Sequence, residues 1–155
     1  MEIGSVMKRT VVSLPLESTL DQVIEAIIKH RVGLIPLIDL DGTLKGIINL
    51  RHILKMAWPR SLDLVQDIDF VHDFGALESS QIQPEQRQQP IRDFMEAPLC
   101  VKNDCGLLRA AAFMSQHRLR DLPIVDKDSK LVGLASWVDV GAAYLKLWTR
   151  PKNAG

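Results

Sequence analysis

The sequence contains little cysteine, few aromatic residues and no excess of either charge. Of 155 residues, 2 are cysteines and 5% are aromatic, and 19 acidic side chains balance 19 basic ones. A framework of several disulfides is therefore excluded, and we expect Cys100 and Cys105 to be reduced thiols in a cytoplasmic protein. The charge balance gives no electrostatic reason to expect binding to nucleic acid or to an anionic membrane.

The sequence also lacks targeting, membrane-spanning and catalytic patterns. The first residues show no basic segment followed by an apolar one, so we expect no signal peptide. The longest apolar stretch, residues 131–148, is interrupted by Ser136, Asp139 and Lys146, which favours a buried strand and helix over a membrane span. We find no nucleophile with its base, no glycine-rich phosphate loop and no His near the cysteines at zinc-ligand spacing. We therefore expect neither an enzyme nor a metal protein.

What the sequence does contain is a duplication. Hydrophobic residues make up 46% of the chain, enough for a packed core. The stretch from His117 to Asp139 matches the stretch from His30 to His52 at an offset of 87 residues, and most positions that differ exchange one aliphatic residue for another. The seven identical pairs are His30 and His117, Arg31 and Arg118, Pro36 and Pro123, Asp39 and Asp126, Asp41 and Asp128, Leu44 and Leu131, and Gly46 and Gly133.

Each copy predicts the same order of elements: a short turn, a strand, a helix, a hairpin and a last helix. In the first copy these are residues 3–7, 10–14, a helix capped by Ser18 with Leu20, Val23, Ile24, Ile27 and Ile28 on its apolar face, strands 34–38 and 44–48 around Asp41-Gly42, and 50–58. In the second they are 91–95, 99–101, a helix capped by Asp104 with Leu107, Leu108, Ala111 and Met114 on its face, strands 122–125 and 131–135, and 137–148.

Two residue types in the hairpins carry positional information. Proline donates no backbone hydrogen bond, so Pro36 and Pro123 are expected at a strand start or an open edge. Gly46 and Gly133 predict a bulge or a close backbone approach.

We predict repeats at residues 1–58 and 91–148, an insertion at 59–90 and a tail at 149–155. Within the insertion, residues 61–74 have the spacing of a helix, and residues 78–90 are polar and unpatterned, as in a flexible loop. The acidic cluster Asp67, Asp69, His72 and Asp73 we interpret as a solvated face. One repeat is too small to cover its own sheet, so the two should share a core.

This combination resembles a pair of cystathionine-beta-synthase-type (CBS) domains, the Bateman module. The resemblance rests on the tandem copies, the H-R-x(4)-P strand entry, the hairpin and the terminal S-x-x-D, and it covers residues 3–58 and 91–148. It implies an α/β (α+β) fold with two small three-stranded sheets and flanking helices, packed about a pseudo-two-fold axis. It also implies two clefts that bind adenosine compounds such as AMP, ADP, ATP or S-adenosylmethionine, and further dimerisation.

The second cleft contains the S-x-x-D motif at Ser136 and Asp139. Ser136 ends a strand and Asp139 lies in the first turn of the next helix, where unpaired backbone N–H groups favour an anion. A serine hydroxyl can bind phosphate, and a carboxylate can accept both hydroxyls of a ribose. The resemblance implies this role directly. The alternative is that Asp139 only caps the helix.

The first cleft has Asn49 and His52 at the equivalent positions. A neutral imidazole has one acceptor nitrogen and cannot accept both hydroxyls of a ribose. We therefore expect this cleft to be empty, to bind more weakly or to hold a different group. The alternative for His52 is a histidine that is solvated or at the edge of the core.

The resemblance implies that residues at the strand entries receive the adenine. For the second cleft these are Arg120, Asp121, Leu122 and Pro123 with Pro98, Leu99 and Cys100. For the first cleft they are Gly33, Leu34, Ile35 and Pro36 with Thr10 and Val11. Many family members have a small residue in place of Asp121 or Leu34. Arg118 and Arg120 are candidates for phosphate contacts; alternatively Arg120 pairs with Asp121 or faces solvent, and the match of Arg118 with Arg31 favours a shared structural role.

The function implied is that of a stand-alone regulatory or sensor module that binds an adenosine ligand and requires no cofactor. The alternative is a ligand-free dimerisation or partner-docking module, with the insertion as the docking element. The last helix is unusually apolar, with Trp137, Tyr144 and Trp148. Because one face of a terminal helix would otherwise meet water, this favours a homodimer contact over the alternative of packing within the protein's own core. We expect no nucleic-acid or membrane partner, and the protein target is left open.

Overall fold

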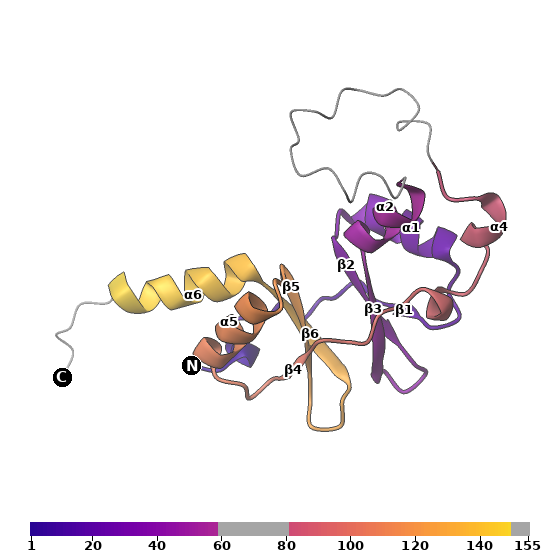
Figure 1. Ribbon diagram of the computed structural model, residues 1–155. Helices are drawn as coiled ribbons and strands as arrows, with labels where there is room; N and C mark the ends of the chain where they lie inside the picture. The colour runs from indigo at the N-terminus through magenta and orange to yellow at the C-terminus, as the bar shows by residue number, and fades with distance from the viewer. Residues whose placement is uncertain (59–80, 150–155) are drawn as a thin grey trace, which may run out of the picture.

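A computed structural model describes residues 1–58 and 81–149 and builds two small sheets from them (Figure 1). The first sheet has the order β1 (Leu14–Pro15), β2 (Leu34–Ile38), β3 (Leu44–Asn49), and the second has the order β4 (Val101–Lys102), β5 (Asp121–Val125), β6 (Leu131–Ser136). In each sheet the hairpin is antiparallel and the short first strand is parallel to the central one. The predicted fold class and both predicted hairpins are confirmed.

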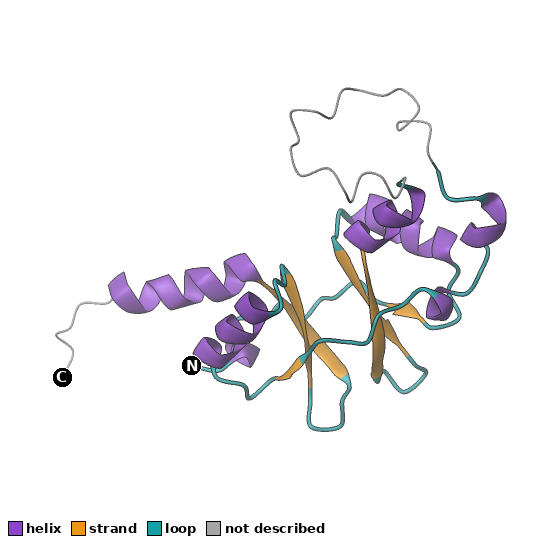
Figure 2. Ribbon diagram, viewed as in Figure 1, coloured by secondary structure: helices purple, strands orange, loops and turns teal. Residues whose placement is uncertain are grey.

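Helices cover the outer faces of the two sheets, which adjoin one another (Figure 2). They are η1 (Ile3–Ser5), α1 (Leu20–His30), α2 (Leu50–Ala57), α4 (Pro84–Arg87), η4 (Ile91–Asp93), α5 (Leu107–Gln116) and α6 (Trp137–Thr149). The two hairpin tips meet, because Leu44 N donates to Ser129 O at 3.0 Å and Leu131 N donates to Gly42 O at 3.0 Å. No helix in the described part of the chain is both long and apolar enough to cross a membrane.

The helix starts differ from the predicted ones. Helix α1 is capped by Thr19 rather than Ser18, because Thr19 and Gln22 form a reciprocal capping box. Helix α5 begins after Gly106, with no side-chain cap bond, rather than at Asp104. Ile28 and Leu108, predicted on the apolar faces, are 67% and 64% exposed. The helices turn their buried faces along Leu20, Val23 and Ile27 and along Leu107, Ala110 and Met114.

The first strand of each repeat is shorter than predicted and begins later in the sequence. This determines which residues of the central strand have a partner on that side. Strands β1 and β4 pair only with the last residues of the central strands, Leu37–Ile38 and Ile124–Val125. Pro36 and Pro123 lie inside the central strands, so the predicted position at a strand start was wrong. The short flanking ladders do not reach the prolines, so the strand edge beside each proline is open, as the other predicted position requires.

The hairpin glycines combine a bulge with a close approach, as predicted. The strand register shifts beside Gly46 and beside Gly133. A Cβ at Gly46 would meet the Met95 sulfur, and a Cβ at Gly133 would meet the Met7 sulfur. Each methionine therefore packs against the hairpin of the other repeat.

The two repeats exchange their opening turns. Ile3 is fully buried in the second core with Leu107, Met114 and Val140, and Ile91 is fully buried in the first core. The backbone follows the same exchange, because Ile3 N donates to Cys105 O at 2.8 Å and Ile91 N donates to Ser18 O at 2.7 Å. Each core is thus completed by the other half of the sequence.

Part of the insertion is ordered against the first core. Residues 84–87 form α4, which starts with Pro84 at its first turn, and Ile82 is buried among the first core residues. The prediction of an unpatterned loop over residues 78–90 was therefore wrong for this portion, where one isoleucine anchors a polar segment. The predicted helix at 61–74 and the acidic cluster at 67–73 lie outside the described residues.

Candidate functional site

Ser136 and Asp139 form a reciprocal pair at the start of α6. The Ser136 hydroxyl donates to Asp139 Oδ2 at 2.7 Å, Ser136 N donates to the same oxygen at 2.9 Å, and Asp139 N donates to Ser136 Oγ at 3.1 Å. This is the geometry of a capping box, so the capping role considered for Asp139 is present. All these bonds to the carboxylate use Oδ2, and they fix the orientation of the second oxygen, Oδ1.

Lys8, from the segment that precedes β1, also reaches this carboxylate. Its ammonium lies 3.4 Å from Asp139 Oδ2, and its side chain is 66% exposed. The backbone of Lys8 is bonded to β6, because Lys8 N donates to Leu134 O at 2.8 Å. Burial tends to raise the pKa of Asp139, but the bonds from Ser136 and the Lys8 ammonium outweigh it and hold the pKa below its ordinary value.

Asp121 and Arg120 add further charges beside the pair. Asp121 faces Ser136 across the β5–β6 ladder, and Arg120 O accepts from Trp137 N at 2.7 Å. Burial raises the pKa of Asp121 above its ordinary value, and its other electrostatic neighbours are Lys8, Asp139 and Arg120. The site therefore combines two cations and two carboxylates at the start of one helix.

The equivalent position in the first repeat has a different set of partners. Asn49 Oδ1 accepts from His52 N at 2.8 Å, which caps α2. Glu96 accepts from Asn49 Nδ2 at 3.1 Å and its carboxylate lies 2.9 Å from His52 Nδ1. Glu96 N donates to Ile47 O at 2.9 Å, so this residue lies beside β3 as Lys8 lies beside β6. His52 is paired with a carboxylate and is partly buried.

The two sites are related by the duplication but have reversed polarity. A cation from the preceding segment meets a helix carboxylate at Lys8 and Asp139, whereas a carboxylate from the preceding segment meets a helix imidazole at Glu96 and His52. Sequence reasoning missed Lys8 and Glu96. The signal was available in the opening turns at residues 3–7 and 91–95, which repeat at an offset of 88 and place Lys8 and Glu96 at equivalent positions.

The other predicted site residues are brought together in part. Gly33 lies beside Asp121, since a Cβ on Gly33 would come 3.9 Å from its carboxylate. Gly33 O accepts from Leu50 N at 2.8 Å, as Arg120 O does from Trp137 N. The entry residues Leu34, Ile35, Pro36, Leu122 and Pro123 are all buried.

The segments before the first strands run from one repeat to the other. Residues 9–13, which include Thr10 and Val11, lead from Lys8 beside β6 to β1 in the first sheet. Residues 97–100, which include Pro98, Leu99 and Cys100, lead from Glu96 beside β3 to β4 in the second sheet. Cys100 and Cys105 are free thiols, and burial raises the pKa of Cys100. The sequence grouped each segment with one cleft, whereas the fold places each segment between the repeats.

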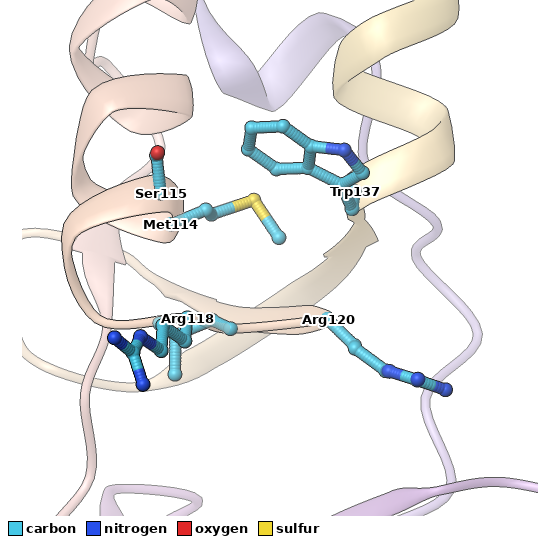
Figure 3. A pocket seen from close by; sticks show the side chains of 6 residues that line it. Met114, Ser115, Arg118, Arg120 and Trp137 are labelled. Carbon is cyan, nitrogen blue, oxygen red and sulfur yellow. The ribbon is translucent and has the colours of Figure 1, made fainter.

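A pocket of about 260 Å³ opens between α5 and α6, next to the Ser136–Asp139 pair (Figure 3). It is lined by Met114, Ser115, Arg118, Leu119, Arg120 and Trp137. Figure 3 shows Arg118 and Arg120 leaving the α5–β5 loop in opposite directions. Arg118 has the left-handed backbone conformation at φ 53°, as Arg31 has at φ 55°, which gives both arginines a shared place at a helix end. Within the described residues no group of three or more potential metal ligands is present.

The sequence profile of the CBS domain matches this chain twice, over residues 3–58 and 91–145. The chain belongs to the CBS domain family. Among curated relatives, a CBS domain-containing protein of Dictyostelium discoideum is 24% identical over 139 residues, which covers 89% of this chain and 87% of that protein. CBSX2, a chloroplastic CBS domain-containing protein of Arabidopsis thaliana, is 25% identical over 144 residues, which covers 88% of this chain and 60% of that protein.

Solved CBS-pair structures share the fold of this chain. The structure of CBSX2 in complex with AMP matches with a TM-score of 0.71 at 23% identity, over 95% of this chain and 98% of that one. The CBS domain pair of protein MJ0100, in complex with 5′-methylthioadenosine and S-adenosyl-L-methionine, matches with a TM-score of 0.67 at 18% identity, over 95% of this chain and 98% of that one.

Proposed function

We propose that this CBS pair is a regulatory module that binds an adenosine compound in the second cleft, at Ser136 and Asp139. The observation that carries the proposal is the orientation of Asp139. Its capping bonds from Ser136 use Oδ2, so Oδ1 is held in a fixed place to accept from a ribose hydroxyl. The start of α6 adds backbone N–H groups that favour an anionic group of the ligand.

The relatives support an adenosine ligand. CBSX2 has been solved with AMP, and the MJ0100 pair with 5′-methylthioadenosine and S-adenosyl-L-methionine. The adenine would lie at the strand entries, where a Cβ on Gly33 would come 3.9 Å from the Asp121 carboxylate, so the Asp121 side chain would have to turn aside for it. The described side chains here serve to bind and orient a ligand, and we propose no catalytic step and no required cofactor.

Regulation would follow from the position of the site between the repeats. Lys8 belongs to the first half of the sequence and Asp139 to the second, so a ligand that engages both changes the relative stability of two arrangements of the halves. A ligand shifts such an equilibrium only by its difference in affinity for the two arrangements.

Calorimetric titration with AMP, ATP and S-adenosylmethionine tests the proposal. We expect binding to the wild type to be lost in Asp139→Ala and kept in His52→Ala, the matched change in the other repeat. Thermal unfolding of both variants would confirm that they fold. Absence of binding by all three compounds, or equal binding by wild type and Asp139→Ala, would leave a ligand-free docking module as the better account.

We also propose that the module forms a homodimer through α6. Val138, Leu145 and Trp148 on this helix are 73%, 52% and 72% exposed, an apolar face that a second copy would cover. Sedimentation of the wild type should give a dimer, and Leu145→Glu with Trp148→Glu should give a folded monomer. A wild-type monomer at all concentrations would contradict this.

For the compartment we propose a reducing one, in which Cys100 and Cys105, both partly buried, stay free thiols. The cytoplasm remains our expectation; a chloroplast, as for CBSX2, is the alternative, and the location of a tagged full-length chain decides between them.

A further inference from the structure

The segments that lead into the two repeats deliver opposite charges to matched places. Lys8 is anchored on β6 through Leu134, and Glu96 is anchored on β3 through Ile47, by paired backbone hydrogen bonds of 2.8–3.0 Å. Leu134 and Ile47 occupy the same position of the duplicated hairpin. The two side chains therefore start from equivalent backbone sites, and what differs is the sign of the charge.

The Lys8–Asp139 contact is easily exchanged. The ammonium is 3.4 Å from an oxygen that already accepts two bonds from Ser136, and the lysine side chain is mostly exposed. Exposed ion pairs of this kind contribute little to stability. A lysine also has a flexible aliphatic stem and three N–H donors. Its ammonium can therefore move from Asp139 to the 5′ side of a bound ribose without any change in the backbone.

Resting on the adenosine site proposed above, we propose that Lys8 makes the second cleft selective for phosphorylated adenosine compounds. In the unliganded cleft Lys8 contacts Asp139 Oδ2. When ribose hydroxyls bind Oδ1, the ammonium moves from Oδ2 to the 5′-phosphate of an anionic ligand and gains a charge-assisted hydrogen bond there. Adenosine has no anionic group for the ammonium, and the sulfonium of S-adenosylmethionine brings a positive charge toward Lys8.

The first cleft has the opposite preference. A phosphate that approached the start of α2 would meet the Glu96 carboxylate, which already lies against Asn49 and His52. The phosphate and the carboxylate would repel each other, because both are negatively charged. The carboxylate also occupies the Asn49 and His52 nitrogens that a phosphate would need as donors. The two repeats of one chain are thus expected to bind one phosphorylated ligand, in the second cleft.

Calorimetry with AMP and adenosine as probes tests the selectivity. We expect the wild type to bind AMP at least about tenfold more tightly than adenosine, as a charge-assisted hydrogen bond provides. Lys8→Met should remove that preference, with AMP weakened about tenfold and adenosine unchanged or tighter, and Lys8→Arg should keep it. Lys45→Met, which breaks a comparable exposed contact of 3.7 Å with Asp39, is the matched control and should change neither.

Stoichiometry tests the first cleft. The double variant Glu96→Lys with His52→Asp copies the polarity of the second cleft and should raise AMP binding from one to two per chain. An unchanged stoichiometry would overturn the charge rule for that cleft.

The outcomes separate the two proposals. A wild type that binds AMP and adenosine equally, or a Lys8→Met variant that keeps the wild-type ratio, overturns the role of Lys8 and leaves the adenosine site intact. If neither compound binds the wild type, the adenosine site and the role of Lys8 fail together.

Discussion

Capping and ligand binding are compatible roles for Asp139. The sequence presented them as alternatives, because a carboxylate in the first turn of a helix suits both. The structure shows that the cap uses a single carboxylate oxygen, Oδ2, and this leaves Oδ1 for the ligand contact that we propose. At Asn49 the cap is made by the amide oxygen alone, and the third residue, His52, turns to Glu96 instead.

Removal of the Ser136 hydroxyl tests the capping contribution. Ser136→Ala removes one accepted and one donated hydrogen bond, and we expect a loss of about 1 kcal/mol in the free energy of unfolding. Thr19→Ala, which breaks the capping box of α1, should cost a similar amount and serves as the comparison. Urea denaturation measures both; a Ser136→Ala variant as stable as the wild type would contradict the capping role.

The pKa of Asp139 predicts a pH dependence of stability. Because its pKa is below the ordinary value in the folded state, the unfolded chain binds the proton more readily, and the carboxylate contributes stability that is fully present at neutral pH. That contribution is lost as the pH falls below the ordinary value of 3.8 and through the lower pKa of the folded state. Asp139→Asn should therefore lose less stability than the wild type over this range in urea titrations. Parallel acid curves for the two proteins would contradict the prediction.

At the scale of the elements, local patterns were the reliable guide. The hairpins follow from short, nearly continuous aliphatic runs on either side of Asp41-Gly42 and Asp128-Ser129, where Gly42 and Ser129 adopt positive φ values of 81° and 63°. The bounds of the first strands were predicted too early, because Lys8 and Glu96 bond to the hairpin of the other repeat before the chain reaches its own sheet. Periodicity reports burial within one element and carries no information about a partner many residues away.

Substitution of two glycines by alanine should change the free energy of unfolding in opposite directions. Gly133 faces the Met7 side chain and the Lys8 carbonyl, so Gly133→Ala should lower the free energy of unfolding by about 1–3 kcal/mol. Gly141 lies inside α6 with open space at its Cβ, so Gly141→Ala should raise it by up to about 1 kcal/mol.

Denaturation midpoints measure both changes, and Met7→Ala tests the mechanism. Shortening Met7 in the Gly133→Ala background should recover part of the loss. Equal shifts for the two glycine variants would show that the methionine contact does not restrict Gly133.

The sequence indicated only part of the candidate site, for the same reason. Ser136 and Asp139 are three residues apart, and their relation is local, so the motif alone identified them. Lys8 and Glu96 come from the opposite half of the sequence, and only the offset of 88 between the opening turns indicates their equivalence. The buried Ile82 illustrates the limit, since one apolar residue in a polar segment gives no periodic signal.

At the scale of the whole molecule, the exchange of turns makes the two repeats one cooperative unit. Ile3 fills the second core although it begins the first repeat, and Ile91 does the reverse. Ile3→Ala should cost about 2–5 kcal/mol, because it leaves a cavity in a fully buried position. The stability of both repeats should fall together, although the substitution lies in one core.

Single-tryptophan versions that keep either Trp58 or Trp137 report the two repeats separately. We expect Ile3→Ala to shift the urea transition equally in both. A shift confined to the Trp137 version would show that the repeats unfold independently. Ile91→Ala, the matched change in the other turn, should likewise shift the transitions of both tryptophan versions equally.

The exchanged turns also set an order of events on the ribosome. Among the described residues, Ile91 is the last buried member of the first core along the chain, so this core can close soon after the second turn leaves the exit tunnel. Ile3, by contrast, packs with Val140 and must remain without its partners until more than a hundred further residues have been made. The first residues to be synthesised are therefore among the last to be buried, and the charge that we assign to ligand selection, on Lys8, reaches its place only after Leu134 and Asp139 have been made.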